Sequence, residues 1–529
     1  MTAAEDPPRI RREAHFGGRV VACFAERAAT ADAMLRAAAA ENPSGDAVVD
    51  GALRLSHAEL DAAATRLAAG FAAQGLKPGE RLALLVGNEW RFVLTLLAAI
   101  RAGLIVVPVS TRSQAPELAY ILDDCGAAGL VYGEAYAGIL PTLDAAPDLR
   151  VRLAAQGEAF AALAETDPAA FVPPPLEEEG TAVILYTSGT TGQPKGAMLT
   201  HLNIVHSCKH FETAFDLSAA DRSLLAVPAT HVTGLVAILF AVLSVGGAAL
   251  ILPKFEVEAF LDLAARERLT YTVMVPAMYN LCLIRAELSD YDLSAWRIGG
   301  FGGAPMPEAT IAALAGKLPG LHLCNAYGAT ETTSPTTITP PDRSERPDSV
   351  GRVVACGDVR IMDSDGREVP PGEPGEVWIA GPMVVPGYWN KPDKTAESFV
   401  AGYWRSGDVG SMDADGWLSV FDRLKDMINR GGYKIYSAEV ENVLSHHPAV
   451  AEAAVVPQAD PVLGERVHAF VHPKPGAAAD AAALKAFCAE RLSDYKVPDG
   501  FTLTDEPLPR NANGKLQKRA LRERVAPHG

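Results

Sequence analysis

The sequence lacks the features that mark disulfide-stabilised, zinc-binding and nucleic-acid-binding proteins. Its seven cysteines, among 529 residues, form no C-x-x-C pair and no His/Cys cluster at zinc spacing. The formal net charge is −17, which disfavours nucleic acid or an anionic membrane as the main partner because both are bound through positive fields. We therefore expect buried, reduced thiols, and local cations wherever an anionic ligand binds.

Targeting and membrane signals are also scarce. The N-terminal stretch MTAAEDPPRIRREAHFGG has no apolar segment of the signal-peptide type, so the prediction is a cytoplasmic protein. The uncharged run at 235–252, LVAILFAVLSVGGAALIL, approaches the length of a membrane span. Its interior SVGG break instead predicts a buried helix followed by a strand, AALIL, and we expect no integral membrane segment.

What the sequence does have is a long alternation of apolar helices and apolar strands. In 91–109, RFVLTLLAAIRAGLIVVPV, a helical pattern ends at Ala102-Gly103 and a Val/Ile-rich strand follows. Such uninterrupted strands predict α/β sheets that are covered on both faces. After about residue 350 short strands and Asp-Gly turns indicate a β-rich part, and the last 100 or so residues restart helix and strand alternation, enough for a separate domain.

The stretch at 186–196, YTSGTTGQPKG, follows an apolar strand and combines hydroxyl groups, glycines and a lysine. Lys195 lies between Pro194 and Gly196, so the stretch is not a Walker A loop, and its spacing does not match G-x-G-x-x-G. Freed backbone N–H groups, the hydroxyls and the ammonium of Lys195 together favour a phosphate-binding loop. The alternative is an ordinary surface turn.

Five further stretches follow in a fixed order: NAYGATETT (325–333), GEVWIAGPMVVPGYWN (375–390), YWRSGDVG (403–410), FDRLKDMINRGGYKIYSAEVE (421–441) and PRNANGK (509–515). Together with the glycine-rich loop they resemble the adenylate-forming superfamily of acyl-CoA synthetases, peptide-synthetase adenylation domains and firefly luciferases. The resemblance extends over nearly the whole chain, and six motifs in register make it specific.

The resemblance implies an architecture as well as a reaction. The expected fold is α/β, with two αβαβα-type sheet subdomains and a β-rich subdomain in an N-terminal domain, residues 1–424. A small, mobile α+β domain, residues 425–529, would carry a catalytic lysine. The expected reaction is the ATP- and Mg²⁺-dependent ligation of a small carboxylic acid to CoA through an acyl-AMP. A monomer and a homodimer both stay open.

The resemblance also assigns roles to residues. Tyr327 would stack on adenine, Glu331 would bind Mg²⁺, and Asp408 would accept the ribose hydroxyls. The expected catalytic residues are Thr190, Lys195, His231, Glu331 and Lys515. The expected nucleotide and acceptor contacts are Thr187, Ser188, Gly189, Thr191, Gly192, Gly302, Gly303, Ala304, Asn325, Tyr327, Gly328, Thr330, Asp408, Arg423, Lys425, Gly431 and Gly432. Lys425 would be the hinge between the two domains, and Gly431-Gly432 would approach the pantetheine in a second orientation of the small domain.

The acyl pocket is expected to be framed by Val232, Thr233, Ala326, Thr333 and Ser334, beside His231, Gly302 and Gly328. These positions hold no lysine or arginine for a second carboxylate, which favours a largely apolar fatty or aryl acid. Thr230 stands where many relatives have an aromatic residue. The alternatives are an acyl-AMP ligase that loads a carrier protein, a luciferase-like oxygenase, and a nucleotide-binding protein without turnover.

Overall fold

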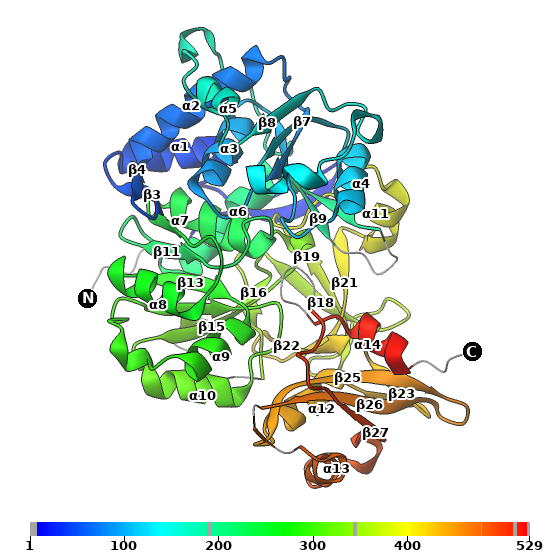
Figure 1. Ribbon diagram of the computed structural model, residues 1–529. Coiled ribbons are helices and arrows are strands. Elements are labelled where there is room, and N and C mark those ends of the chain that lie inside the picture. The colour runs from blue at the N-terminus through cyan, green and yellow to red at the C-terminus, as the bar shows by residue number, and fades with distance from the viewer. Residues whose placement is uncertain are drawn as a thin grey trace.

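A computed structural model describes residues 8–187, 193–341, 346, 348–474, 476–477, 479–510 and 516–525 of the chain. Figure 1 shows two sheet-and-helix parts stacked on each other, a curved β-rich part beside them in yellow, and a small C-terminal part below in orange and red. This is the predicted α/β arrangement of a large N-terminal and a small C-terminal part.

The first sheet holds six strands and lies in the upper part of Figure 1. Its order is β10 (Lys195–Thr200), β9 (Thr181–Thr187), β6 (Ile105–Pro108), β5 (Arg81–Leu85), β7 (Ala127–Tyr132) and β8 (Val151–Ala154). All pairs are parallel except β9–β10. In β5, Leu82 and Leu84 face the main core while Ala83 and Leu85 belong to a second core under α4 (Ala115–Cys125). Alternate residues of one strand are thus buried on opposite faces, as the apolar pattern predicts.

The second sheet has fourteen described strands, thirteen of them on one continuous path, and the first half of this path is mainly parallel. This half runs β4 (Leu53–Ser56), β3 (Asp46–Asp50), β12 (Ala248–Ile251), β11 (Arg222–Leu225), β13 (Tyr271–Met274), β14 (Ile298–Phe301) and β15 (His322–Tyr327). Only the β3–β4 pair of this half is antiparallel. The carboxyl ends of β11, β13, β14 and β15 therefore lie at one edge.

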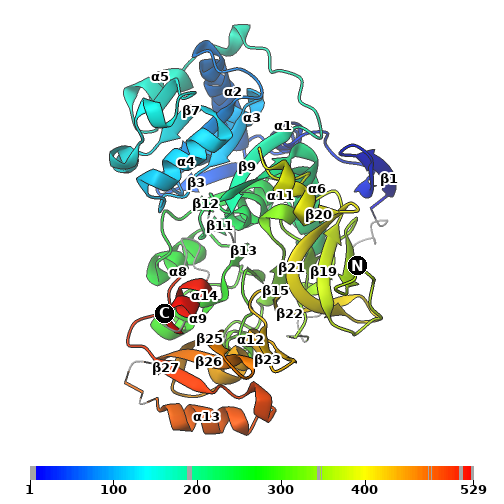
Figure 2. The ribbon, with the colours of Figure 1, turned by 90° about the vertical axis from the view of Figure 1, so that its right-hand side faces the viewer.

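The antiparallel half of the same sheet is the predicted β-rich part. It continues through β16 (Thr337–Ile338), β17 (Gly351–Val353), β22 (Trp417–Arg423), β21 (Tyr403–Met412), β19 (Gly375–Ala380) and β18 (Asp358–Met362), with β20 (Phe399–Val400) on β21. The two halves join where Ala326 and Tyr327 of β15 pair with Ile338 and Thr337. Figure 2 shows β19 and β21 curving around one side of the molecule.

Helices fill the space between the sheets and cover their outer faces (Figures 1 and 2). In the N-terminal part they are α1 (Ala31–Glu41), α2 (His57–Ala73), α3 (Trp90–Arg101), α4, α5 (Glu158–Ala164), α6 (His201–Phe215), α7 (Ala241–Ser244), α8 (Val257–Arg266), α9 (Pro276–Arg285), α10 (Glu308–Lys317) and α11 (Pro392–Ser398). Short 3-10 turns are η1 (Glu134–Ile139), η2 (Leu143–Ala145), η3 (Pro168–Ala170), η5 (Leu288–Asp290) and η6 (Thr330–Thr332). Capping boxes fix the starts of α2, through Ser56 and Glu59, and of α6, through Thr200 and Asn203.

The uncharged run at 235–252 forms the predicted buried helix and strand. Its helix begins as a π-helix, η4 (Thr233–Phe240), continues as α7, and is followed by β12 in the sheet. A π-helix of this length is rare, and π-helical turns are frequently found at functional sites. No helix in the described part of the chain is long and apolar enough to cross a membrane.

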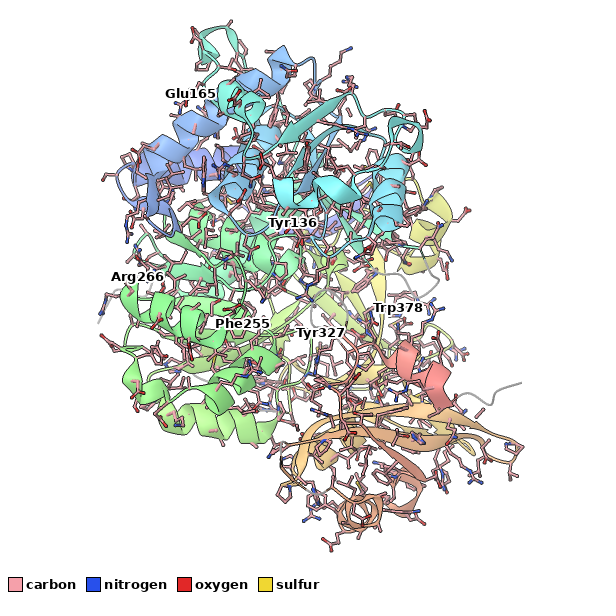
Figure 3. The ribbon with its side chains drawn as sticks, in the orientation of Figure 1. Tyr136, Glu165, Phe255, Arg266, Tyr327 and Trp378 are labelled. Atoms are coloured by element: carbon pink, nitrogen blue, oxygen red, sulfur yellow. The ribbon has the colours of Figure 1, made fainter. Side chains whose placement is uncertain are left out.

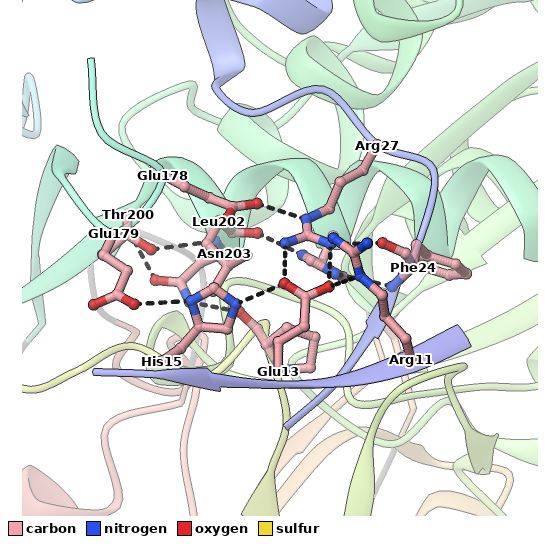
Figure 4. Close-up of polar contacts among 12 residues, drawn as sticks. Arg11, Glu13, His15, Phe24, Arg27, Glu178, Glu179, Thr200, Leu202 and Asn203 are labelled. Carbon is pink, nitrogen blue, oxygen red and sulfur yellow. Dashed lines mark hydrogen bonds and ion pairs between the residues drawn. The ribbon is translucent and has the colours of Figure 1, made fainter. Parts of the chain in front are cut away.

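A separate hairpin at the N-terminus, β1 (Ile10–His15) and β2 (Arg19–Phe24), packs against the connector that leads into β9. Figure 4 shows its polar anchor: both carboxylate oxygens of Glu13 accept from Arg27, and His15 contacts Glu179 at 2.8 Å. Arg27 also donates to Glu178 at 2.5 Å. The proline- and glutamate-rich connector at 173–180 is therefore held in place by charge pairs.

The C-terminal part has its own five-stranded sheet. Its order is β24 (Tyr433–Ile435), β23 (Ile428–Arg430), β26 (Gly464–Pro473) and β25 (Val450–Asp460), with β27 (Gly500–Leu503) on β26. Its helices are α12 (Ser437–Ser445), α13 (Ala481–Ala489) and α14 (Lys518–Val525), with a short turn η8 (Asp494–Lys496). The chain leaves the large sheet with β22 and enters the small one with β23; the division between residues 424 and 425 stays a prediction.

Candidate functional site

Most predicted site residues lie at one edge of the large sheet, where parallel strands end. His231 to Thr233 follow β11, Gly302 to Ala304 follow β14, and Gly328 to Ser334 follow β15. Ligands of open α/β sheets bind outside the carboxyl ends of the strands. The sheet topology thus brings together three segments that are spread over residues 231–334 of the sequence.

The segment after β11 is shaped by Asn88, a buried residue between β5 and α3. Its side-chain amide donates to the carbonyls of Leu225, Val227 and Leu252, and its oxygen accepts from the N–H of Ala229. Further along, a Cβ at Gly234 would lie 2.3 Å from the carbonyl oxygen of Pro228, so this turn requires glycine. These contacts place the half-buried His231 at the start of the π-helix, with Val232 buried beside it.

The segment after β14 approaches β15 closely. A Cβ at Gly302 would lie 2.5 Å from the carbonyl oxygen of Ala326, and Gly303 has φ +77°. Gly303 and Ala304 are exposed. The glycines therefore leave an open backbone surface beside Asn325 and Ala326, as expected where a flat ligand meets the main chain.

The segment after β15 is a tight, buried turn around η6. Thr330, Glu331, Thr333 and Ser334 are all at least nine-tenths buried. Thr333 and Ser334 have φ of 50° and 37°, a conformation that is costly for residues with a Cβ, above all for a β-branched one. Gly328 is closely packed, since an added Cβ would lie 3.1 Å from Thr332 Oγ1. The backbone of this turn is strained, as is common at functional sites.

Asp408, Tyr327 and Arg423 form one polar group below this edge. The Tyr327 hydroxyl donates to Asp408 Oδ2 at 2.7 Å, and Arg423 Nε lies 3.2 Å from Asp408 Oδ1. Asp408 and Arg423 are direct cross-strand partners in β21 and β22. Burial and the neighbouring carboxylate raise the pKa of Tyr327, so its hydroxyl stays a donor. The ion partner of Arg423 is thus Asp408. Figure 3 shows Tyr327 in the middle of the molecule.

Lys195 and Glu331 contact different parts of the Tyr388 side chain. Lys195 Nζ is 4.2 Å from the centre of the Tyr388 ring, and the Tyr388 hydroxyl donates to Glu331 Oε1 at 2.8 Å. Burial lowers the pKa of Lys195, while the charge of Glu331 opposes that shift. Tyr388 lies in the quoted stretch GEVWIAGPMVVPGYWN, but its role was not predicted.

Several predicted residues fall outside the described part of the chain. They are Ser188, Gly189, Thr190, Thr191, Gly192 and the lysine at 515. Thr187, at the end of β9, donates from its hydroxyl to the carbonyl of Lys195 at 3.4 Å.

The predicted hinge and acceptor residues lie at the start of the small domain. Lys425 is exposed between β22 and β23, and its carbonyl accepts from Arg522 of α14 at 2.9 Å. Gly431 and Gly432 form the exposed turn of the β23–β24 hairpin, with φ of +59° and +95°. Both glycines need that conformation, but nothing in the described contacts brings them to the edge that holds Glu331.

The oxygen chemistry around Glu331 fits Mg²⁺. In the described part of the chain, the only cluster of at least three close His, Cys, Asp or Glu ligand atoms is Glu13, His15 and Cys23, in the N-terminal hairpin. The Glu13 carboxylate is already bound by Arg27. Glu331 therefore offers a single buried carboxylate, and Mg²⁺ is typically held by one or two carboxylates together with substrate phosphates and water.

Comparisons with known proteins agree with this geometry. The family described as AMP-binding enzyme matches residues 35–389, and the AMP-binding enzyme C-terminal domain matches residues 439–515. A feruloyl-CoA synthase of Amycolatopsis is 37% identical over 91% of this chain and 96% of its own length. A fatty acid–[acyl-carrier-protein] ligase, ScoC of Streptomyces coeruleorubidus, is 33% identical over 92% and 94%.

A solved structure extends the likeness to the fold. O-succinylbenzoate coenzyme A synthetase of Bacillus subtilis, in complex with ATP and a magnesium ion, superposes with a TM-score of 0.81 at 30% identity. The superposition covers 93% of this chain and 98% of that one. The agreement therefore includes both the large and the small parts.

Proposed function

Because the chain belongs to the AMP-binding enzyme family and is an AMP-forming acid–thiol ligase of that family, we propose that it joins a largely apolar fatty or aryl acid to CoA. The reaction consumes ATP and releases AMP and pyrophosphate. The carboxylate attacks the α-phosphorus to give an acyl-AMP and pyrophosphate, and the thiol then displaces AMP to give a thioester. ATP, Mg²⁺ and CoA are the proposed cosubstrates and cofactor.

One observation carries the proposal. A half-buried lysine and a buried carboxylate, Lys195 and Glu331, are held on one tyrosine at the edge where the parallel strands end. A cation for a polyphosphate and an oxygen ligand for a divalent cation are the two groups that nucleotide activation requires at one place. Asp408 is buried and accepts a hydrogen bond from Tyr327. Its carboxylate supplies an acceptor for the ribose hydroxyls.

In the adenylation step, different residues bind the phosphates, the adenine and the ribose. Lys195 neutralises the β- and γ-phosphates together with the hydroxyls of the loop at 187–192, and Thr330 is a further phosphate contact. Tyr327 and the glycines at 302–303 hold the adenine, while Asp408 and Arg423 hold the ribose. Mg²⁺, bound through Glu331, would spread the negative charge of the triphosphate. Lys515 would stabilise the charge between the carboxylate and the α-phosphate.

The second step requires a different face of the small domain. We propose that the small domain rotates about Lys425, withdrawing Lys515 and presenting Gly431 and Gly432 to the thiol. The chain passes from the large sheet to a separate small sheet at this point, which supports a hinge there. His231, at the start of the π-helix, would shield the adenylate from water.

The acid is proposed from the residues around it. Val232 and Ala326 are buried and apolar, and Thr333 and Ser334 are small. A feruloyl-CoA synthase and a fatty acid ligase are among the relatives, so both aryl and aliphatic acids belong to the proposal. The likeness to a carrier-protein ligase also favours a second candidate, in which the acceptor thiol belongs to a carrier protein. All seven cysteines are buried free thiols, which supports a reducing cytoplasm as the location.

The test is to measure AMP and pyrophosphate release from purified protein with ATP and Mg²⁺, across fatty acids of graded length, benzoates and cinnamates. Each acid is tried with CoA, without an acceptor, and with a phosphopantetheinylated carrier protein. CoA-dependent AMP release with one class of acid is the expected result. Release that requires the carrier protein would establish the second candidate, and no release with any acid would overturn both.

A further inference from the structure

Tyr388 is fixed in place by the strand that carries Lys195. Tyr388 forms an antiparallel bridge with Ala197, and its neighbours extend the pairing: Trp389 N–H donates to Gly196 O at 2.7 Å and Met198 N–H to Gly387 O at 3.1 Å. The N–H of Tyr388 donates to Thr395 Oγ1 at 2.9 Å. The side chain is 4% exposed. The pairing with β10 therefore fixes the backbone of Tyr388, and close burial restrains its ring.

The Tyr388 side chain contacts two opposite charges. Lys195 Nζ contacts the ring face and Glu331 Oε1 accepts from the hydroxyl, so each charge is satisfied by a different part of the same side chain. Burial raises the pKa of Tyr388, which keeps the phenol neutral and its hydroxyl a donor. In the part of the chain that the structure describes, Lys195 and Glu331 contact Tyr388 and form no ion pair with each other.

Without this ring the two charges would be expected to pair. Opposite charges in a poorly solvated place attract strongly, and a lysine side chain is long and flexible enough to reach a nearby carboxylate. Such a pair would occupy the cation that a polyphosphate needs and the carboxylate that a metal ion needs. Both would have to be separated before a nucleotide could bind.

We propose that Tyr388 is a positioning residue that keeps Lys195 and Glu331 apart, so that the ammonium stays available to a polyphosphate and the carboxylate to a divalent cation. This inference rests on the proposed function, since it assumes that ATP binds at this edge. It differs from a purely structural role, in which the ring would only fill space against Phe399, 5.7 Å away between ring centres.

The test is a double-mutant cycle on the binding of metal-free ATP, measured by calorimetry in EDTA with wild-type protein, Tyr388→Leu, Glu331→Gln and the double variant. Tyr388→Leu is expected to weaken binding about tenfold, because Lys195 then pairs with Glu331. Glu331→Gln removes a negative charge and should raise the affinity for metal-free ATP in either background. This rise in affinity is expected to be about fivefold larger in the Tyr388→Leu background. Equal gains in both backgrounds would overturn the proposal.

Tyr388→Phe gives a second test that preserves the packing. The ring still separates the charges, so affinity for metal-free ATP is expected to stay within about twofold of wild type. The hydroxyl contact to Glu331 is lost, so the Mn²⁺ concentration needed for half-maximal ATP binding is expected to rise about fivefold. Tyr403→Phe is the matched control, because it removes a tyrosine–carboxylate bond to Asp358 elsewhere. Identical behaviour of the two variants would contradict the inference.

The outcomes also separate the two proposals. Absence of ATP binding to the wild-type protein, with and without Mn²⁺, would overturn the proposed function. ATP binding that is strengthened by Mn²⁺ but shows no coupling between positions 388 and 331 would overturn only the role of Tyr388.

Discussion

Asp422 accepts two hydrogen bonds from Ser437, one from its backbone N–H at 2.5 Å and one from its hydroxyl at 2.6 Å. Asp422 belongs to β22 of the large sheet, whereas Ser437 begins α12 of the small domain. Lys518 of α14 donates to the same hydroxyl at 2.6 Å and pairs with Glu441 at 2.7 Å. The contact therefore crosses the proposed hinge and holds the two domains in the orientation observed.

Ser437→Ala should change the two half-reactions unequally. The variant loses the hydroxyl contacts to Asp422 and Lys518, so the observed orientation loses about 1–2 kcal/mol relative to the other one. We expect the ratio of pyrophosphate release to thioester formation from supplied acyl-AMP to change at least about threefold. Ser445→Ala, whose hydroxyl bonds only within α12, should leave the ratio unaltered. An unchanged ratio in Ser437→Ala would show that the contact does not govern rotation.

Lys515→Ala should abolish pyrophosphate release and still allow supplied acyl-AMP and CoA to form the thioester. The reason is that the proposed charge of this lysine acts only on the carboxylate and the α-phosphate.

Lys425→Pro should retain pyrophosphate release and lose thioester formation, because proline restricts the backbone of the hinge. The two half-reactions are followed separately by pyrophosphate release and by thioester formation. Lys485→Ala, on the exposed side of α13, is the control, and equal loss of both half-reactions in Lys515→Ala would contradict the two-orientation mechanism.

Asp408→Ala should weaken ATP binding about 10- to 100-fold, the usual cost of losing charged hydrogen bonds. The variant also removes the acceptor for the Tyr327 hydroxyl and the ion partner of Arg423. Tyr327→Phe should have a smaller effect, since the aromatic ring remains. Calorimetry with ATP measures both, and Asp415→Ala, at an exposed hairpin turn, serves as the control. Unchanged ATP affinity in Asp408→Ala would remove the ribose role.

Triphosphate affinity should depend on the charge of Lys195 in the alkaline range. Burial lowers the pKa of Lys195 below that of an exposed lysine. The charged form is therefore complete below the lowered pKa and is lost as the pH rises through it, earlier than for an ordinary lysine. ATP affinity measured from pH 7 to 10 should fall with this titration. Lys195→Arg, whose guanidinium stays charged, should flatten the profile even if it binds less well; an identical profile would exclude Lys195 as the titrating group.

Acid should loosen the N-terminal hairpin through Glu13. Hydrogen bonds from Arg27 hold the pKa of Glu13 well below its usual range. The stabilisation is thus complete above the unfolded-state pKa, about 4.3, and is lost as the pH falls from there toward the folded-state value. Glu13→Gln should destabilise the protein by about 2 kcal/mol at pH 7 and remove part of the acid sensitivity. Thermal unfolding from pH 3 to 7 measures both effects, with Glu165→Gln as an exposed control; parallel curves for Glu13→Gln and wild type would contradict the assignment.

Local sequence patterns predicted the fold class, and they marked most of the segments that the sheet topology brings to one edge. The apolar runs at 91–109 and 235–252 became helix and strand as expected, because burial on both sides of a parallel strand requires continuous apolar residues. Glycine and hydroxyl residues marked the segments that follow β9, β14 and β15. These motifs could be recognised in the sequence because their residues are next to one another.

The π-helical start of 233–240 was not predictable from periodicity. The segment is apolar all round, so its pattern does not distinguish helical pitches, and its form depends on the contacts of Asn88 and Gly234 at its entry. The ion partner of Arg423 was not predictable from neighbouring residues either: adjacent residues of a strand point to opposite faces, and Asp408 lies across the ladder from Arg423.

The sequence by itself thus determined which chemical groups this protein carries and in what local turns they lie, because those turns depend on residues next to one another. Only the tertiary structure decided which groups meet. Tyr388 reaches Glu331 across 57 residues and Tyr327 reaches Asp408 across 81. Such contacts arise from strand pairing between distant segments, and it is this pairing that places a tyrosine between the lysine and the carboxylate of the site.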